Sequence, residues 1–77
     1  MKTITSINKD AQKEIKDLTR NGNGYLFNTD DEGNLIRGMH VESVIYYDLK
    51  HWSFYYDEMN GFCEIVNNKF NKINNQI

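Results

Sequence analysis

The side chains best suited to bind a metal ion lie in residues 28–33, where oxygen-bearing residues precede Gly33. Oxygens at alternate positions followed by glycine are typical of the start of a calcium-binding loop. Such a loop needs a bidentate Glu at its twelfth position, and the twelfth residue here is Met39. A polar turn between two strands is therefore the better interpretation, and we expect no metal and no cofactor.

Catalytic chemistry has equally few candidates. His40, His51 and Cys63 lack the close paired spacing of a zinc site, and no nucleophile with a base or Gly-rich phosphate loop accompanies them. Cys63 is the only cysteine, which excludes an intramolecular disulfide and suits a reducing cytosol. The sequence therefore predicts a protein that is not an enzyme and that works in the cytoplasm.

The most distinctive feature is aromatic: six of the ten aromatic residues fall within residues 46–56. Because strand residues alternate between faces, Ser53 and Tyr55 are expected on the face opposite Trp52, Phe54 and Tyr56. A two-residue loop at Leu49-Lys50 puts Tyr46 on the Tyr55 face, whereas a three-residue loop exchanges Tyr46 for Tyr47. Either register predicts Tyr55 as the most exposed ring.

Acidic residues concentrate in the same part of the chain, although the whole chain carries a net charge of only −2. Residues 30–64 contain eight Asp/Glu against two Lys/Arg. Acids around exposed tyrosines suit docking onto a basic protein surface, because they steer the encounter while the rings supply buried area. The predicted partner-binding set is Tyr46, Tyr55, Glu42, Asp48, Asp57, Glu58, Asp30, Asp31 and Glu32.

A first helix is predicted over residues 8–20, capped by Asn8 or Ser6 and ended by the Asn/Gly run at 21–24. Its apolar stripe is Ile7, Ala11, Ile15 and Leu18. A basic stripe lies nearly opposite and gives an alternative, nucleic-acid-binding function to Lys9, Lys13, Lys16 and Arg20. Acids between the two stripes make a solvated outer face the commoner explanation.

Three strands are predicted after this helix, at about residues 24–28, 35–47 and 51–56, with a turn around Gly33. Whether 35–47 is one strand bent near Gly38 or two strands stays open, and we favour one. Apolar residues at three- and four-residue steps predict a second helix over about 58–73: Met59, Phe62, Cys63, Val66, Phe70 and Ile73. The expected fold is a single α+β domain, residues 1–77, with a three-stranded antiparallel sheet covered on one face by two helices.

This order of elements is similar to that of double-stranded-RNA-binding domains. In that family the second helix begins with a phosphate-binding lysine cluster, whereas the matching residues 57–61 here include Asp57 and Glu58. We therefore do not assign the chain to that family.

The sequence favours a small inhibitor or adaptor that docks its acidic, Tyr-bearing open sheet face onto a larger, nucleic-acid-handling protein. A composition rich in Asn, Ile and Lys, typical of AT-rich genomes, suggests a phage or mobile-element protein of the anti-defence, anti-CRISPR type, acting in the host cytoplasm. A homodimer that pairs through the sheet face or an exposed edge is the alternative to a foreign partner.

Overall fold

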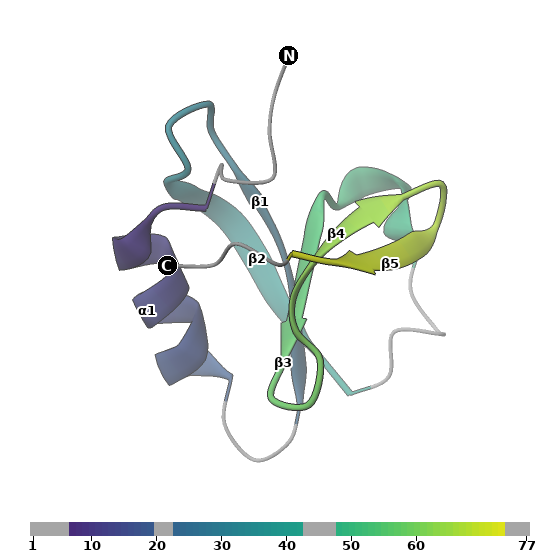
Figure 1. The fold of residues 1–77 in the computed structure, drawn as a ribbon, viewed down its shortest axis with the longest axis horizontal. Coiled ribbons are helices and arrows are strands. Elements are labelled where there is room, and N and C mark those ends of the chain that lie inside the picture. The colour runs from purple at the N-terminus through teal and green to yellow at the C-terminus, as the bar shows by residue number, and fades with distance from the viewer. Residues whose placement is uncertain (1–6, 20–22, 43–47, 74–77) are drawn as a thin grey trace.

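The fold combines one α-helix with a five-stranded antiparallel sheet, as the computed structural model shows for residues 7–19, 23–42 and 48–73 (Figure 1). The helix α1 spans Lys9–Leu18, and a short 3-10 helix, η2, spans Leu49–His51. The strands are β1 (Gly24–Thr29), β2 (Leu35–Val41), β3 (Phe54–Asp57), β4 (Gly61–Val66) and β5 (Lys69–Lys72). Their order across the sheet is β2-β1-β3-β4-β5.

The predicted second helix over 58–73 is wrong: this segment is the hairpin β4–β5. Phe62 and Cys63 are adjacent and both buried, each in a different core, as expected for a strand covered on both faces. Asn67 and Asn68 form the two-residue turn with positive φ angles of 53° and 63°. A strand that packs against a core on each face carries apolar residues at consecutive positions. In this segment they also fit the three- and four-residue steps of a helix, and for this reason the prediction failed. The similarity in element order to double-stranded-RNA-binding domains disappears with this helix.

The predicted strands need smaller corrections. The strand expected at 51–56 begins only at Phe54, because His51 belongs to η2. Within the strand expected at 35–47, β2 ends at Val41, and residues 43–47 lie outside the described part of the chain. The irregularity falls opposite Asn28/Thr29 rather than at Gly38, and it leaves Ile36 unpaired as the bulged residue.

The first helix matches its prediction closely. Asn8 is the N-cap, and its side-chain oxygen accepts a hydrogen bond of 2.8 Å from the Ala11 amide. The Asn8 side chain also donates to Asn34 Oδ1 at 2.7 Å, which ties the start of the helix to the β1–β2 turn. Ile7, Ala11 and Ile15 are buried as expected, but Leu18 is 39% exposed.

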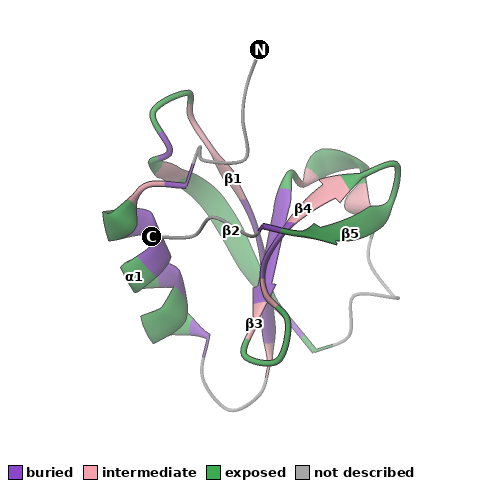
Figure 2. Ribbon diagram, viewed as in Figure 1, coloured by how far each residue is buried: buried purple, intermediate pink, exposed green. Residues whose placement is uncertain are grey.

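Packing against both faces of the sheet is the largest departure from the predicted architecture. Under α1, the first core consists of Ile7, Ala11, Ile15, Tyr25, Phe27, Phe54, Tyr56, Phe62 and Ile73, with Leu35 at its margin. On the opposite face, the second core consists of Leu26, Val41, Tyr55 and Cys63, with Leu49, Trp52 and Ile65 packed against it. The burial colours show this central strip between the exposed edge strands β2 and β5 (Figure 2). The second sheet face is therefore not the open platform that we expected.

Membrane insertion through a helix is not supported by the described residues. Neither α1 nor any other helix within 7–19, 23–42 and 48–73 has the length and apolar character required to cross a bilayer.

Candidate protein-binding surface

The β3–β4 turn, residues 57–61, is held in shape by a single carboxylate. Asp57 Oδ1 accepts a hydrogen bond of 2.6 Å from the Asn60 amide. Asp57 Oδ2 accepts one of 3.0 Å from Asn60 Nδ2 and one of 2.8 Å from the Tyr55 hydroxyl. Gly61 closes the turn with φ 70°, a left-handed conformation that glycine adopts without steric cost. Two side chains and a backbone amide thus converge on Asp57 and fix the loop.

The electrostatics of this turn favour an ionised carboxylate. Partial burial acts to raise the pKa of Asp57, but the hydrogen bonds from Asn60 and Tyr55 outweigh it and hold the pKa below its usual value. For Tyr55, burial, the hydrogen bond to Asp57 and the nearby negative charge all raise the pKa of the phenol. The pair is therefore a neutral phenol that donates to a carboxylate at physiological pH.

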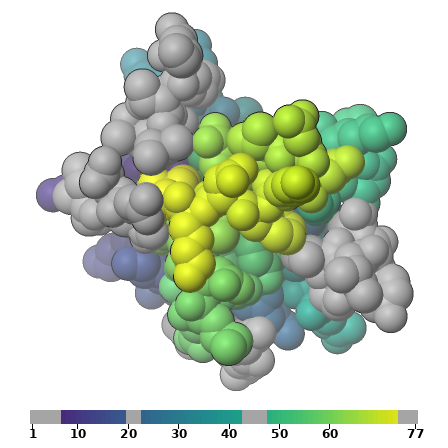
Figure 3. All heavy atoms as spheres, turned by 45° about the vertical axis from the view of Figure 1, so that its right-hand side comes forward, coloured from purple at the N-terminus to yellow at the C-terminus, as the bar shows by residue number. Residues whose placement is uncertain are grey.

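The fixed turn presents one apolar side chain almost fully to solvent. Met59 is 91% exposed at its tip, beside the exposed carboxylate of Glu58. The β3–β4 turn projects at the lower end of the molecule in Figure 3, below the surface made by β5. A flexible, polarisable methionine on a rigid, acidic loop is suited to enter a pocket of a protein partner.

Tyr55, which we predicted to be the most exposed ring, is in fact buried, with 9% exposure. Its ring lies 4.9 Å from that of Phe70, measured between centroids, and it covers Gly24, where a Cβ atom would come closer than 3.0 Å to the phenol. The predicted alternation of Tyr55 against Phe54 and Tyr56 is confirmed, but both faces are covered. Tyr55 can therefore act on a partner only indirectly, by positioning Asp57.

Trp52 was assigned to the face of Phe54 and Tyr56, and this assignment is wrong. Its ring packs against the second core, because Trp52 is the C-cap of η2 and lies outside β3, where strand alternation does not apply. Tyr46, the other predicted anchor, lies outside the described residues.

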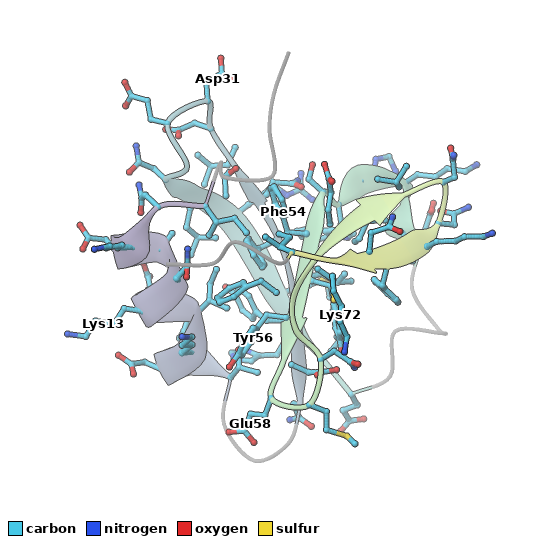
Figure 4. The ribbon with its side chains drawn as sticks, in the orientation of Figure 1. Lys13, Asp31, Phe54, Tyr56, Glu58 and Lys72 are labelled. Atoms are coloured by element: carbon cyan, nitrogen blue, oxygen red, sulfur yellow. The ribbon has the colours of Figure 1, made fainter. Side chains whose placement is uncertain are left out.

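The predicted acids do not form one continuous surface. Asp31 and Glu58 lie at opposite ends of the molecule in Figure 4. The β1–β2 turn carries Asp30, Asp31 and Glu32 at one end, whereas Glu42 follows β2 at the end where Asp57 and Glu58 follow β3. Within this second group, Asp57 and Glu58 belong to the turn that carries the exposed Met59, and Glu42 lies at the same end of the sheet.

Two of the predicted acids, Asp30 and Asp48, have evident structural roles. Asp30 Oδ1 accepts hydrogen bonds of 2.9 Å from the amides of Glu32 and Asn34, and the Asn34 contacts lead the causes that lower the pKa of Asp30. Asp48 caps η2 by accepting from the Lys50 amide at 3.0 Å. These are local turn and cap interactions of the kind that Asp commonly makes.

The alternative basic surface is partly present. Lys9, Lys13 and Lys16 line a shallow depression of about 410 Å³ along α1, together with Gln12 and Asp17. Lys16 extends over the Phe62 ring, with its Nζ 5.9 Å from the ring centroid. Arg20 lies outside the described residues. The acid Asp17 within the depression weakens its attraction for phosphate.

Sequence reasoning overlooked Met59 and Asn60 as parts of a surface turn because both were placed in a helix. A signal was present: Asp57 followed three residues later by Asn60-Gly61 is a frequent turn pattern, since Asp accepts from nearby amides and Gly permits positive φ.

Among residues 7–19, 23–42 and 48–73, no three His, Cys, Asp or Glu side chains come together to hold a metal ion. Comparisons with protein-family models, curated proteins and solved structures found no match for this chain.

Proposed function

We propose that this protein is a small non-enzymatic binding module, an inhibitor or adaptor, that docks the acidic end of its sheet onto a basic site of a larger protein. The observation that carries the proposal is the β3–β4 turn, which exposes 91% of Met59 on a loop fixed by three hydrogen bonds to Asp57. A preorganised loop loses little conformational entropy on binding, so more of its contact energy becomes affinity.

The charges around this turn favour a basic partner. Glu58 is exposed on the turn, Asp57 is held ionised within it, and Glu42 follows β2 at the same end of the sheet. Acids around an apolar anchor accelerate the encounter with a Lys/Arg-rich surface and disfavour acidic partners. Proteins that handle nucleic acid carry such basic surfaces, and an AT-rich, phage-like composition fits a protein that blocks a host defence or replication enzyme.

The test is an affinity capture from a lysate of an AT-rich bacterial host, with and without nuclease, followed by mass spectrometry. The tagged wild-type chain is compared with Met59→Ser and Glu58→Lys, both on exposed side chains of the turn. Glu32→Lys is the matched control, because it makes the same charge change at an exposed position of the β1–β2 turn.

The proposal expects one nuclease-resistant partner that is retained by Glu32→Lys and lost by both β3–β4 variants. Equal loss with Glu58→Lys and Glu32→Lys, with the partner retained by Met59→Ser, would point to general charge attraction rather than to the turn. Recovery that depends on nucleic acid would favour the lysines of α1, and recovery of the bait alone at dimer mass would favour self-association.

A further inference from the structure

The strand β2 forms a free edge of the sheet, because among the described strands its neighbour is β1 alone. In an antiparallel sheet, successive residues direct their N–H and C=O groups to alternate sides of the strand. The hydrogen bond from the Ile65 amide to the Ser53 carbonyl fixes this alternation, and the strand registers carry it across the sheet to β2. The backbone groups of Met39 therefore point to β1, whereas those of Gly38 and His40 point outward. Each of these two residues offers a donor and an acceptor at the edge.

The polar side chains of β2 do not shield this edge, because they are held against their own molecule. The Arg37 guanidinium carbon lies 4.6 Å from the centroid of the Trp52 ring. His40 Nε2 donates to the Leu18 carbonyl, at the end of α1, over 2.8 Å. Gly38 lies between them in the strand and has no side chain. The outward backbone groups are thus accessible to another strand.

The two free edges of the sheet, β2 and β5, differ in length and in charge. β5 has four residues, and two of them are lysines, Lys69 and Lys72, which are typical protection of an edge against pairing. β2 has seven residues and no lysine. It is largely exposed (Figure 2), and its apolar side chains Ile36 and Met39 are 60% and 37% exposed. β2 is therefore the edge better suited to accept a further strand.

We propose that this further strand is β2 of a second copy of the chain, paired antiparallel with Gly38 of each copy opposite His40 of the other. Because both residues offer a donor and an acceptor, each of the two Gly38–His40 pairs gains two main-chain hydrogen bonds. The arrangement has a two-fold axis, as most dimers do, and the axis passes beside Met39. The two exposed Met39 side chains meet there and bury apolar surface.

The charges of the strand fit a second copy in this register. Arg37 of each copy lies opposite Val41 of the other, so no like charges face each other directly. Residues 35–42 carry one cation and one anion, Arg37 and Glu42, so the formal charges of the paired strands cancel when His40 is counted as neutral. Pairing of two β5 strands would instead bring two lysines from each copy together without an acid.

This self-association is independent of the proposed protein-binding surface. The β3–β4 turn is separated from the free edge of β2 by the strand β1, so Met59 stays exposed in the pair. A strand of a different protein is the alternative occupant of the β2 edge, and it would leave the purified chain monomeric.

The experiment is sedimentation equilibrium of the full chain from about 1 µM to about 1 mM, the range in which weak complexes dissociate. In parallel, NMR follows hydrogen exchange at the amides of Gly38 and His40 at the two ends of this range. The variant His40→Pro removes one outward N–H and leaves the hydrogen bonds between β2 and β1 in place, a position at which an edge strand tolerates proline. His40→Ala is the matched control, because it loses the same side chain and its bond to Leu18 but retains the N–H.

A second pair of variants keeps every main-chain group. Met39→Lys brings two cations together at the two-fold axis. Phe70→Lys is its control, because Phe70 is equally exposed, at 37%, on the opposite edge of the sheet. Circular dichroism checks that each variant is folded, and Met39→Lys decides the result should His40→Pro fail to fold.

The proposal expects a monomer–dimer equilibrium within this concentration range, with slower exchange at Gly38 and His40 as the dimer forms. His40→Pro and Met39→Lys should weaken the dimer at least about tenfold, whereas His40→Ala and Phe70→Lys should change its affinity by less than about twofold. A chain that stays monomeric throughout, a dimer that resists Met39→Lys, or equal weakening by the matched controls would overturn the proposal. Dimer formation without slower exchange at Gly38 and His40 would also overturn it, because the contact would then lie on another surface.

Discussion

The hydroxyl of Tyr55 allows a direct test of how the β3–β4 turn is held. Tyr55→Phe keeps the ring that contacts Phe70 and covers Gly24, and removes only the donor to Asp57. A hydrogen bond to a charged acceptor contributes about 1.5–3 kcal/mol. We expect the lower end, about 1.5 kcal/mol, because Asp57 is half-buried and retains two bonds from Asn60.

The measurement is urea unfolding followed by circular dichroism. A chain of this size has a net stability of about 3–5 kcal/mol and an m-value of about 1 kcal/mol/M. The expected loss therefore lowers the midpoint of the Tyr55→Phe variant by roughly 1.5 M. Tyr56→Phe is the matched control: Tyr56 is the next strand residue and equally buried, and the described residues include no partner for its hydroxyl.

Tyr55→Ala separates burial from hydrogen bonding. Deleting a buried aromatic side chain costs about 3–5 kcal/mol, which equals the whole expected stability, so this variant should be largely unfolded. A Tyr55→Phe midpoint no lower than that of Tyr56→Phe would refute the role of the hydroxyl. A folded Tyr55→Ala variant with near wild-type stability would refute the second core itself.

Three further outcomes are expected from the structure. Hydrogen bonds hold the pKa of Asp57 in the folded state below its unfolded value of about 3.9. The ionised carboxylate therefore stabilises the fold above that pH, and this stabilisation is lost as the pH falls through the lower folded pKa. The urea midpoint should fall between about pH 5 and pH 3, and it should fall less in the Asp57→Asn variant. Gly24→Ala should lower the thermal midpoint by at least about 4 °C in a calorimetric scan, because its Cβ would collide with the Tyr55 ring. Asn67→Ala should lose about 1 kcal/mol in urea titrations whereas Asn67→Gly should not, because φ is 53° there, and equal losses would contradict the turn assignment.

The parts of the fold that depend on local chemistry could be predicted from the sequence. Asn8 accepts from the Ala11 amide and Gly33 permits a left-handed turn, so the start of α1 and the first hairpin follow from neighbouring residues. The segment 58–73 could not be predicted in this way. Whether Phe62 and Cys63 face one core or two depends on what covers the second sheet face, and that is decided by long-range pairing of β4 with β3.

The candidate surface was predictable to a similar extent. Asp57 and Glu58 were selected for their charge, but the role of Asp57 as the acceptor that shapes its turn depends on Tyr55 and Asn60. The antiparallel order places Asp31 and Glu58 at opposite ends of the sheet, a separation that charge alone does not predict. Alternation along β3 was correct, yet exposure of its second face could not be inferred without knowing what packs there.

The interior strand β1 determines how the whole molecule should unfold. Leu26 and Phe27 are consecutive and fully buried, and each belongs to a different core. The two cores therefore share one stretch of backbone. If the residues of one core unfold and β1 loses its place in the sheet, the β1 side chain that belongs to the other core is also exposed. Unfolding should consequently be a single cooperative transition, in which the fluorescence of Trp52 on one face and the ellipticity of α1 on the other change together.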